Sequence, residues 1–299
     1  MILAIDVGNT NTVLGCLKGD HIEFTLRIRS DRDKTADEYL LLIDGLLRNQ
    51  GVDPASLEGG ILSSVVPELR IVMKNAMERL TGKSFLAVGT GIKTGLDIRT
   101  DNPAQLGADL VVDAVAALAK YKPPLVIFDM GTATTLSVVD RRGSYLGGMI
   151  IPGLRLSVDA LSARAAQLPY IHLGAPERLI GTNTVDCMQA GAVYSNAAML
   201  DGLIDRVEEE LGEPVTAVAT GGLMGTVAPY CKRKIFYDEN LMLEGLSLLY
   251  RKTSKEGLAP AAAVKAPIPE RKSCPRKTGM PVGGDSFCHG GRPENTGLP

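Results

Sequence analysis

Two short segments of the sequence carry the same order of side chains that could bind phosphate. Residues 6–12 read Asp-Val-Gly-Asn-Thr-Asn-Thr, and residues 129–135 read Asp-Met-Gly-Thr-Ala-Thr-Thr. A glycine at a tight bend lets backbone N–H groups approach an anion, and Asn and Thr side chains add donors. The leading Asp is a hard oxygen ligand that suits Mg²⁺ or a monovalent cation. The pattern predicts two hairpins that hold the phosphates of one nucleotide between them.

The second segment repeats the first. Three residues of the first copy align with identical residues of the second: Asp6 with Asp129, Gly8 with Gly131 and Thr12 with Thr135. Ordinary turns are the alternative explanation, because Asp-x-Gly followed by Thr or Asn is common in turns. The repeat favours phosphate binding. Its spacing is far longer than the roughly 20–50 residues of a solenoid unit, which indicates a duplicated domain.

A third segment, Thr220-Gly221-Gly222, follows the apolar run at residues 213–219 and precedes a helix-like stretch. Two glycines between a strand and a helix let the backbone lie against a nucleoside, with the helix N-terminus facing negative charge. A tight turn between a strand and a helix explains the same pattern equally well. Both interpretations stay open at this point.

The elements that must position these segments are alternating strands and helices. Apolar runs at residues 2–8, 12–17 and 21–28 predict a three-stranded antiparallel meander, and a capping box at Thr35 and Glu38 predicts the start of a helix. The rest of this half is predicted as follows: a strand at 59–66, a helix opened by Pro67, a strand at 84–88 and a helix that starts at Asn102 and Pro103.

The second half repeats this order of elements. Its predicted elements are a hairpin at 126–140, a strand at 144–153, a long helix at 184–211, a strand at 214–222 and a last helix at 240–252. The pattern predicts an α/β protein whose two halves, residues 1–122 and 123–252, share one topology and face each other across a cleft.

Residues 253–299 differ in composition from the rest of the chain. They hold seven of the 17 Pro residues and few apolar ones, and such a segment cannot repay the entropy of ordering. We therefore expect a disordered tail. Cys274, Cys288 and His289 lie there at a loose spacing that is weak support for a metal site, so they stay unassigned.

The composition excludes several classes of protein. The net charge of −2 argues against nucleic-acid binding, which needs a clustered positive surface. No apolar run approaches the roughly 18 residues of a membrane span, and the N-terminus has no basic leader. The five Cys residues follow no regular spacing, as in a protein with reduced thiols. We expect a cytoplasmic protein.

The two hairpins and the Gly-Gly segment together resemble the acetate and sugar kinase, Hsp70 and actin superfamily. The order and spacing of six segments resemble the type III pantothenate kinases in particular: residues 6–12, 101–109, 129–135, 147–153, 180–191 and 220–222. The resemblance covers about residues 1–252. It implies two duplicated ribonuclease H-like (actin-like ATPase) domains that face a nucleotide cleft, and a homodimer.

The resemblance implies transfer of the γ-phosphoryl group of ATP to the primary hydroxyl of pantothenate, the first step toward coenzyme A. The residues expected to bind ATP are Thr132 and the first hairpin: Asp6, Val7, Gly8, Asn9, Thr10, Asn11, Thr12 and Val13. Asp6 would act chiefly through Mg²⁺. Asp129 would hold a monovalent cation, K⁺ or NH₄⁺, that helps offset the phosphate charge.

The resemblance also implies which residues hold the acceptor. Asp109 would be the general base, and the substrate contacts would be Gly107, Ala108, Asp109, Leu110 and Thr184. The local pattern alone favours a solvated helix Asp close to Asp113, and only the resemblance reverses that interpretation. Small residues along the helix at 184–211 suit packing between two subunits, and a buried intramolecular helix explains them equally well.

Two residues depart from the family's pattern. Thr100 stands where Tyr is frequent, and Leu110 stands where Arg is usual. Leu cannot offer the pantothenate carboxylate a charge-assisted hydrogen bond. Two alternatives follow: a catalytically weak nucleotide-binding regulatory homologue, and a kinase for another small hydroxyl acceptor. Because Asp109 and both hairpins are intact, an active pantothenate kinase is favoured.

Overall fold

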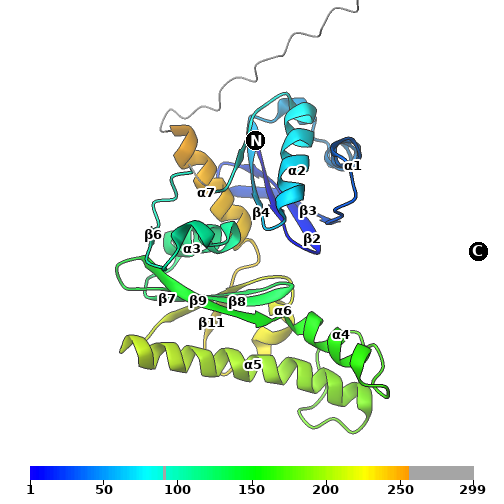
Figure 1. The fold of residues 1–299 in the computed structure, drawn as a ribbon, viewed down its shortest axis with the longest axis vertical. Helices are drawn as coiled ribbons and strands as arrows, with labels where there is room; N and C mark the ends of the chain where they lie inside the picture. The colour runs from blue at the N-terminus through cyan, green and yellow to red at the C-terminus, as the bar shows by residue number, and fades with distance from the viewer. Residues whose placement is uncertain (90–91, 256–299) are drawn as a thin grey trace, which may run out of the picture. The chain divides into compact units, whose positions relative to one another are not determined.

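The computed structural model describes residues 1–89 and 92–255 of the chain (Figure 1). The predicted tail was placed at 253–299, but the last helix, α7 (Leu241–Lys255), includes its first three residues. Thr253 is buried there, and its hydroxyl donates to the Leu249 carbonyl oxygen at 2.9 Å, so this residue belongs to the packed helix. The rest of the predicted tail, with Cys274, Cys288 and His289, lies outside the described residues.

The first sheet has the strand order β3-β2-β1-β4-β5. Its strands are β1 (Ile2–Val7), β2 (Asn11–Lys18), β3 (His21–Arg29), β4 (Gly59–Ser64) and β5 (Phe85–Ala87). The first three form the predicted antiparallel meander, and β4 and β5 run parallel to β1. Two helices, α1 (Ala36–Asn49) and α2 (Pro67–Thr81), bury their apolar stripes against one face of this sheet. The predicted capping box at Thr35 and Glu38 is confirmed.

The second sheet has the order β11-β10-β7-β8-β9-β6. Its strands are β6 (Asp97–Ile98), β7 (Leu125–Met130), β8 (Ala133–Val139), β9 (Ser144–Pro152), β10 (Thr216–Thr220) and β11 (Ile235–Tyr237). Apart from the short edge strand β6, the order and directions match those of the first sheet. The predicted duplication of topology is therefore confirmed.

Three helices accompany the second sheet. They are α4 (Leu154–Arg164), α5 (Thr184–Leu211) and the single turn α6 (Met224–Val227). The long helix α5 has the predicted bounds, because the Asn183 side chain accepts a hydrogen bond from the Asp186 N–H at its start and Gly212 takes a left-handed conformation, with a φ of 70°, at its end. Apolar residues of α5 and α6 pack with β7 and β10.

Two helices connect the sheets: α3 (Ala108–Lys120) and α7. The apolar side of α7 packs on the first sheet against Ile2 and Ala4, although α7 comes from the end of the described chain. Conversely, alanines of α3 pack on β7 of the second sheet. The helices cross so closely that a Cβ on Gly245 would lie 2.6 Å from the Val112 carbonyl oxygen. Figure 1 shows α7 beside the first sheet and α3 above the second.

The start of α3 differs from the prediction. A helix was expected from Asn102 and Pro103, but Pro103–Gln105 forms only one 3₁₀ turn, and the Asn102 side chain does not cap it. The chain then becomes extended at Leu106, and α3 begins after Gly107. Separately, no helix among the described residues is long and apolar enough to cross a membrane.

Candidate active site

The two predicted phosphate hairpins meet at their tips. In the β1–β2 hairpin the Gly8 N–H donates to the Asn11 carbonyl oxygen at 3.0 Å, and in the β7–β8 hairpin the Gly131 N–H donates to the Ala133 carbonyl oxygen at 3.0 Å. The hydroxyls of Thr10 and Thr132 lie within hydrogen-bond distance of each other. The structure thus brings the two halves of the predicted nucleotide site together. It also shows that the glycine N–H groups are already used within the turns.

The register of the hairpins corrects one detail of the predicted repeat. Val7 pairs with Thr12, whereas its counterpart Met130 pairs with Thr134. The second turn is therefore one residue shorter, and Thr134 rather than Thr135 is the counterpart of Thr12. Both of these threonines are fully buried. The sequence comparison missed the shift because a Thr stands at both neighbouring positions.

The predicted ATP-binding residues divide into exposed and buried ones. Val7 belongs to the core, and the buried Thr12 hydroxyl is paired with the Ser30 hydroxyl at 2.9 Å, so their side chains are not available to a ligand. The exposed side chains are those of Asn9, Thr10, Asn11 and Thr132. The carboxamide oxygen of Asn9 accepts a hydrogen bond from Arg32 at 3.1 Å, which orients its side chain.

Asp6 and Asp129 face the region where the sheets approach each other. Alternate residues of a strand share a face, so Asp6 lies on the same face of β1 as Ile2 and Ala4, which pack against α7. Asp129 likewise shares a face of β7 with Ile127, which packs with residues of α3. Burial, followed by repulsion from Asp129 and Asp109, raises the pKa of Asp6 to about 7. Burial and repulsion from Asp109 raise the pKa of Asp129 to about 6.

Asp109 lies in the first turn of α3, where Gly107 is the N-cap residue. Its Oδ1 accepts a hydrogen bond from the Leu110 N–H at 2.9 Å, and burial raises its pKa. A Cβ on Gly107 would lie only 2.4 Å from this Oδ1. The glycine therefore leaves space for the carboxylate. Because Asp109 raises the pKa of both Asp6 and Asp129, the predicted base lies in the same electrostatic cluster as the hairpin carboxylates.

Asp113 is a fourth member of this cluster that sequence reasoning treated only as a neighbour of Asp109. Its side chain is 2% exposed, and its Oδ1 has no hydrogen-bond partner among the described residues. Burial, then repulsion from Asp129 and Asp109, raises its pKa well above the usual value. A signal was present in the sequence, because this Asp interrupts the apolar run of α3 one turn after Asp109.

The carboxylates of Asp6 and Asp129 would need further oxygen ligands, such as those of a bound phosphate, to hold a metal ion. Within residues 1–89 and 92–255, no three His, Cys, Asp or Glu side chains form a group that could hold a metal ion. Mg²⁺ commonly binds to one or two carboxylates together with substrate phosphates. The hard oxygen donors of Asp6 and Asp129, beside two hairpins that suit phosphate, fit that arrangement.

The Gly-Gly segment directly follows β10, and its first glycine packs against the end of the neighbouring strand β7. Gly221 has a φ of 95°, and a Cβ there would lie 2.6 Å from the Met130 backbone nitrogen. The conformation and the close packing both require glycine, so the tight-turn interpretation accounts for Gly221. The following helix α6 is a single turn. Gly222 is different, because the nearest atom to its Cβ position is Arg27 Nη1 at 3.2 Å.

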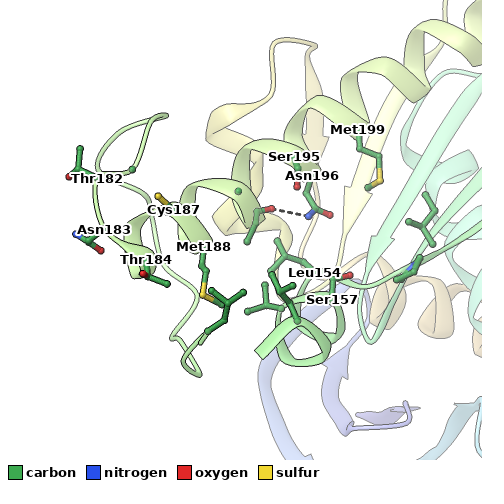
Figure 2. A pocket seen from close by; sticks show the side chains of 18 residues that line it. Leu154, Ser157, Thr182, Asn183, Thr184, Cys187, Met188, Ser195, Asn196 and Met199 are labelled. Carbon is green, nitrogen blue, oxygen red and sulfur yellow. Dashed lines mark hydrogen bonds between the residues drawn. The ribbon is translucent and has the colours of Figure 1, made fainter. Parts of the chain in front are cut away.

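Thr184 does not lie with the other predicted substrate contacts. It lines an open, largely apolar pocket of about 950 Å³ between α4, α5, the end of β9 and the loop at 181–183. Figure 2 shows Thr182, Asn183, Thr184 and Cys187 at the end of this pocket where α5 begins. None of residues 107–110 lines it.

Thr100, one of the two residues that depart from the family's pattern, has a hydroxyl that is shielded from solvent and lacks a hydrogen-bond partner in the described part of the chain.

Comparison with solved structures supports the fold. A putative Baf family transcriptional activator from Campylobacter jejuni superposes with a TM-score of 0.54 at 18% identity, covering 85% of this chain and 99% of that one. A putative 2-dehydro-3-deoxygalactonokinase from Sinorhizobium meliloti superposes with a TM-score of 0.53 at 12% identity, covering 84% and 96%. At these identities the likeness concerns the fold alone. The predicted class of two duplicated ribonuclease H-like domains is confirmed.

Comparison of sequences reaches further. A family model described as type III pantothenate kinase matches residues 2–206. The type III pantothenate kinase of Moorella thermoacetica is 45% identical over 254 residues, which cover 85% of this chain and 100% of that relative. The type III pantothenate kinase of an Exiguobacterium species is 46% identical over 255 residues, again covering 85% and 100%.

Proposed function

Because the chain belongs to the type III pantothenate kinase family and uses ATP to phosphorylate pantothenate in coenzyme A biosynthesis, we propose that Asp109 is the general base of this transfer. The observation that carries the proposal is the position of Asp109. It lies at the start of α3, in the electrostatic cluster with Asp6 and Asp129, beside the two hairpins whose tips touch.

The chemistry of phosphoryl transfer explains why a carboxylate is needed there. The primary hydroxyl of pantothenate loses its proton as its oxygen bonds to the γ-phosphorus of ATP, and a base within hydrogen-bond reach accepts that proton. Burial raises the pKa of Asp109, so its carboxylate holds a proton more readily than a solvated Asp. The Leu110 N–H fixes one carboxylate oxygen, which leaves the other for the hydroxyl.

The phosphates of ATP bind between the two hairpins in this proposal. The side chains of Asn9, Thr10, Asn11 and Thr132 donate hydrogen bonds to phosphate oxygens, because the N–H groups of Gly8 and Gly131 are satisfied within their turns. Val7, Thr12 and Val13 hold the first hairpin in shape and contribute no side-chain donor. Residues 6–13 thus remain the nucleotide-binding hairpin, in which some side chains bind phosphate and others only maintain the fold of the hairpin.

Asp6 and Asp129 would hold the cations. Asp6 would hold Mg²⁺ through its carboxylate, directly or through water, and Asp129 would hold K⁺ or NH₄⁺. Burial and neighbouring acids raise the pKa of both carboxyl groups, so a bound cation would favour their ionised forms. When bound, the cations supply positive charge that offsets the charge of the phosphates.

We also propose a cytoplasmic homodimer in which Thr184 contacts pantothenate close to the subunit interface. The pocket lined by Thr184 is open and largely apolar, and one of the apolar side chains that line it, that of Leu161, is 49% exposed. An open pocket lined by apolar side chains is a feature that protein interfaces commonly cover. A second subunit would cover it and bring polar groups of one chain toward the acceptor.

The test is acceptor-dependent turnover. The purified full chain is mixed with ATP, Mg²⁺ and K⁺, and ADP release is measured with pantothenate and with a panel of other small hydroxyl compounds. ADP should form only with pantothenate. Equal or faster release with another acceptor would identify a different kinase, and ATP binding without turnover would identify a regulatory homologue.

A further inference from the structure

The guanidinium group of Arg27 has no hydrogen-bond or ion-pair partner among residues 1–89 and 92–255. Arg27 is an exposed residue of β3. An unpaired arginine on a surface is ordinary. Arg27 differs because of what surrounds it.

The strand register places Arg27 on the inner face of the first sheet. Its Cα pairs with that of Val13 in β2, and Val13 packs with the cluster formed by β1, β4 and α7. Side chains at paired positions of neighbouring strands lie on the same face. Arg27 therefore lies on the side of the sheet that Asp6 also faces, next to the last residue of the nucleotide hairpin.

The side chain also reaches the second half of the chain. A Cβ on Gly222 would lie 3.2 Å from Nη1 and 3.8 Å from Nη2 of Arg27, so the guanidinium lies against the Gly-Gly segment. Burial raises the pKa of both Asp6 and Tyr237, and the positive charge of Arg27 offsets part of the rise in each. Arg27 thus lies between Asp6 and the Gly-Gly segment.

Negatively charged groups gather around this position. Asp6, Asp109 and Asp129 repel one another, and ATP adds further negative charge. Neither hairpin, at residues 6–13 or 129–135, contains a Lys or Arg. The hairpin side chains therefore offer phosphate only neutral donors, and a positive side chain at the phosphates would come from another element.

We propose that Arg27 binds the phosphate oxygens of ATP across the contact between the two halves. The proposal rests on the nucleotide site described under the proposed function and adds a residue outside its hairpins. The planar guanidinium presents paired N–H donors that match two phosphate oxygens, which a lysine cannot reproduce. The glycine at 222 leaves the space that this side chain occupies.

The test compares four proteins: the wild type, Arg27→Ala, Arg27→Lys and Arg141→Ala. For each protein, binding is measured with three ligands: ATP with Mg²⁺, inorganic tripolyphosphate and adenosine. Hydrogen bonds to charged groups imply that Arg27→Ala weakens ATP and tripolyphosphate binding about 10-fold to 100-fold. Adenosine binding and the KM for pantothenate should stay unchanged, and Arg27→Lys should be intermediate. Arg141, which pairs with Glu213 and is three-quarters exposed, controls for the loss of one positive charge.

Other outcomes would overturn the proposal. Unchanged tripolyphosphate binding by Arg27→Ala would mean that Arg27 does not touch phosphate, even if adenosine bound more weakly. Equal losses for all three ligands, with a lower melting temperature, would mean that Arg27 only holds the two halves together. If Arg27→Ala does not fold, Arg27→Gln and Arg27→Lys provide the same comparison. Failure of the wild type to bind ATP would instead contradict the nucleotide site itself.

Discussion

The hydroxyl oxygens of Thr10 and Thr132 lie 3.0 Å apart, although 122 positions separate the two residues in the chain. Each hydroxyl stands at the exposed tip of one hairpin, and the hairpins are copies of one another in topology. A phosphate oxygen placed near this pair can receive a hydrogen bond from both copies. The duplication thus produces a site that neither half contains alone.

This relationship predicts the behaviour of Thr10→Val and Thr132→Val. Each change removes one hydroxyl and keeps the shape of the side chain, so each should raise the KM for ATP roughly threefold to tenfold, the usual value of one hydrogen bond. The double variant should lose less than the product of the two single effects, because both donors serve one ligand. Thr25→Val, at an exposed position of β3, should match the wild type. Full additivity would mean that the two hydroxyls act independently.

A second prediction concerns the space beside the proposed base. In Gly107→Ala the new methyl group would lie 2.4 Å from Asp109 Oδ1, and the carboxylate would rotate away, since the end of a side chain moves more easily than backbone. We expect kcat to fall at least about tenfold, because a general base contributes roughly 10²–10⁴-fold. The melting temperature should change little. In the control Gly45→Ala, the new Cβ meets nothing within 4 Å. An unchanged kcat in Gly107→Ala would show that the carboxylate position is unimportant.

The acidic cluster predicts a pH dependence of stability. Folding raises the pKa of Asp6 from 3.8 to about 7 and that of Asp129 from 3.8 to about 6. The folded protein therefore binds more protons than the unfolded one between about pH 4 and pH 7, and its free energy of unfolding falls as the pH rises through that range. Without ATP, Mg²⁺ and K⁺, the melting temperature should be lower at pH 8 than at pH 5.

The variant Asp113→Asn tests how Asp113, the buried member of the acidic cluster, contributes to this pH dependence. The amide removes a carboxyl group that repels both Asp6 and Asp129 when it is charged, so the difference in melting temperature between pH 5 and pH 8 should shrink. Asp101→Asn, at an exposed position, should leave the difference as it is in the wild type. A melting temperature that rises from pH 5 to pH 8 in the wild type would contradict the raised pKa values.

The proposed dimer predicts the effect of a charge on the apolar surface. Leu161→Glu places a carboxylate on a 49% exposed residue that lines the pocket of Thr184, and burying it without a partner is costly. The variant should be monomeric in sedimentation, with a raised KM for pantothenate and unchanged ATP binding. Leu41→Glu, at a 71% exposed position of α1, is the matched control. A dimer that survives Leu161→Glu would place the interface elsewhere.

Several parts of the fold could be predicted because their signals are local. The Thr35 capping box, the bounds of α5 and the meander of β1 to β3 depend on residues close in the sequence. The repeated Asp and Gly positions revealed the duplication. The exact register did not follow from the repeat, because neighbouring threonines hid a turn shortened by one residue.

Other features depend on contacts that the sequence does not display. Asp113 is distant in the chain from Asp6 and Asp129, and only the packing of α3 brings it near them. Arg27 is likewise distant from Gly222, and only the fold brings the two together. The start of α3 was misplaced because Asn102 and Pro103 are a good helix start in isolation, yet they open only a 3₁₀ turn. Likewise, no local pattern shows that α7 packs on the first sheet.

The most direct test of the proposed mechanism is the rate of pantothenate-dependent ADP release by Asp109→Asn. The amide keeps the size of the side chain but cannot accept the hydroxyl proton as a carboxylate does, so kcat should fall about 10²–10⁴-fold while ATP binding is retained. Asp101→Asn, in the exposed segment before α3, should keep the wild-type rate. If Asp109→Asn retained more than about a tenth of the wild-type rate, Asp109 would not be the base.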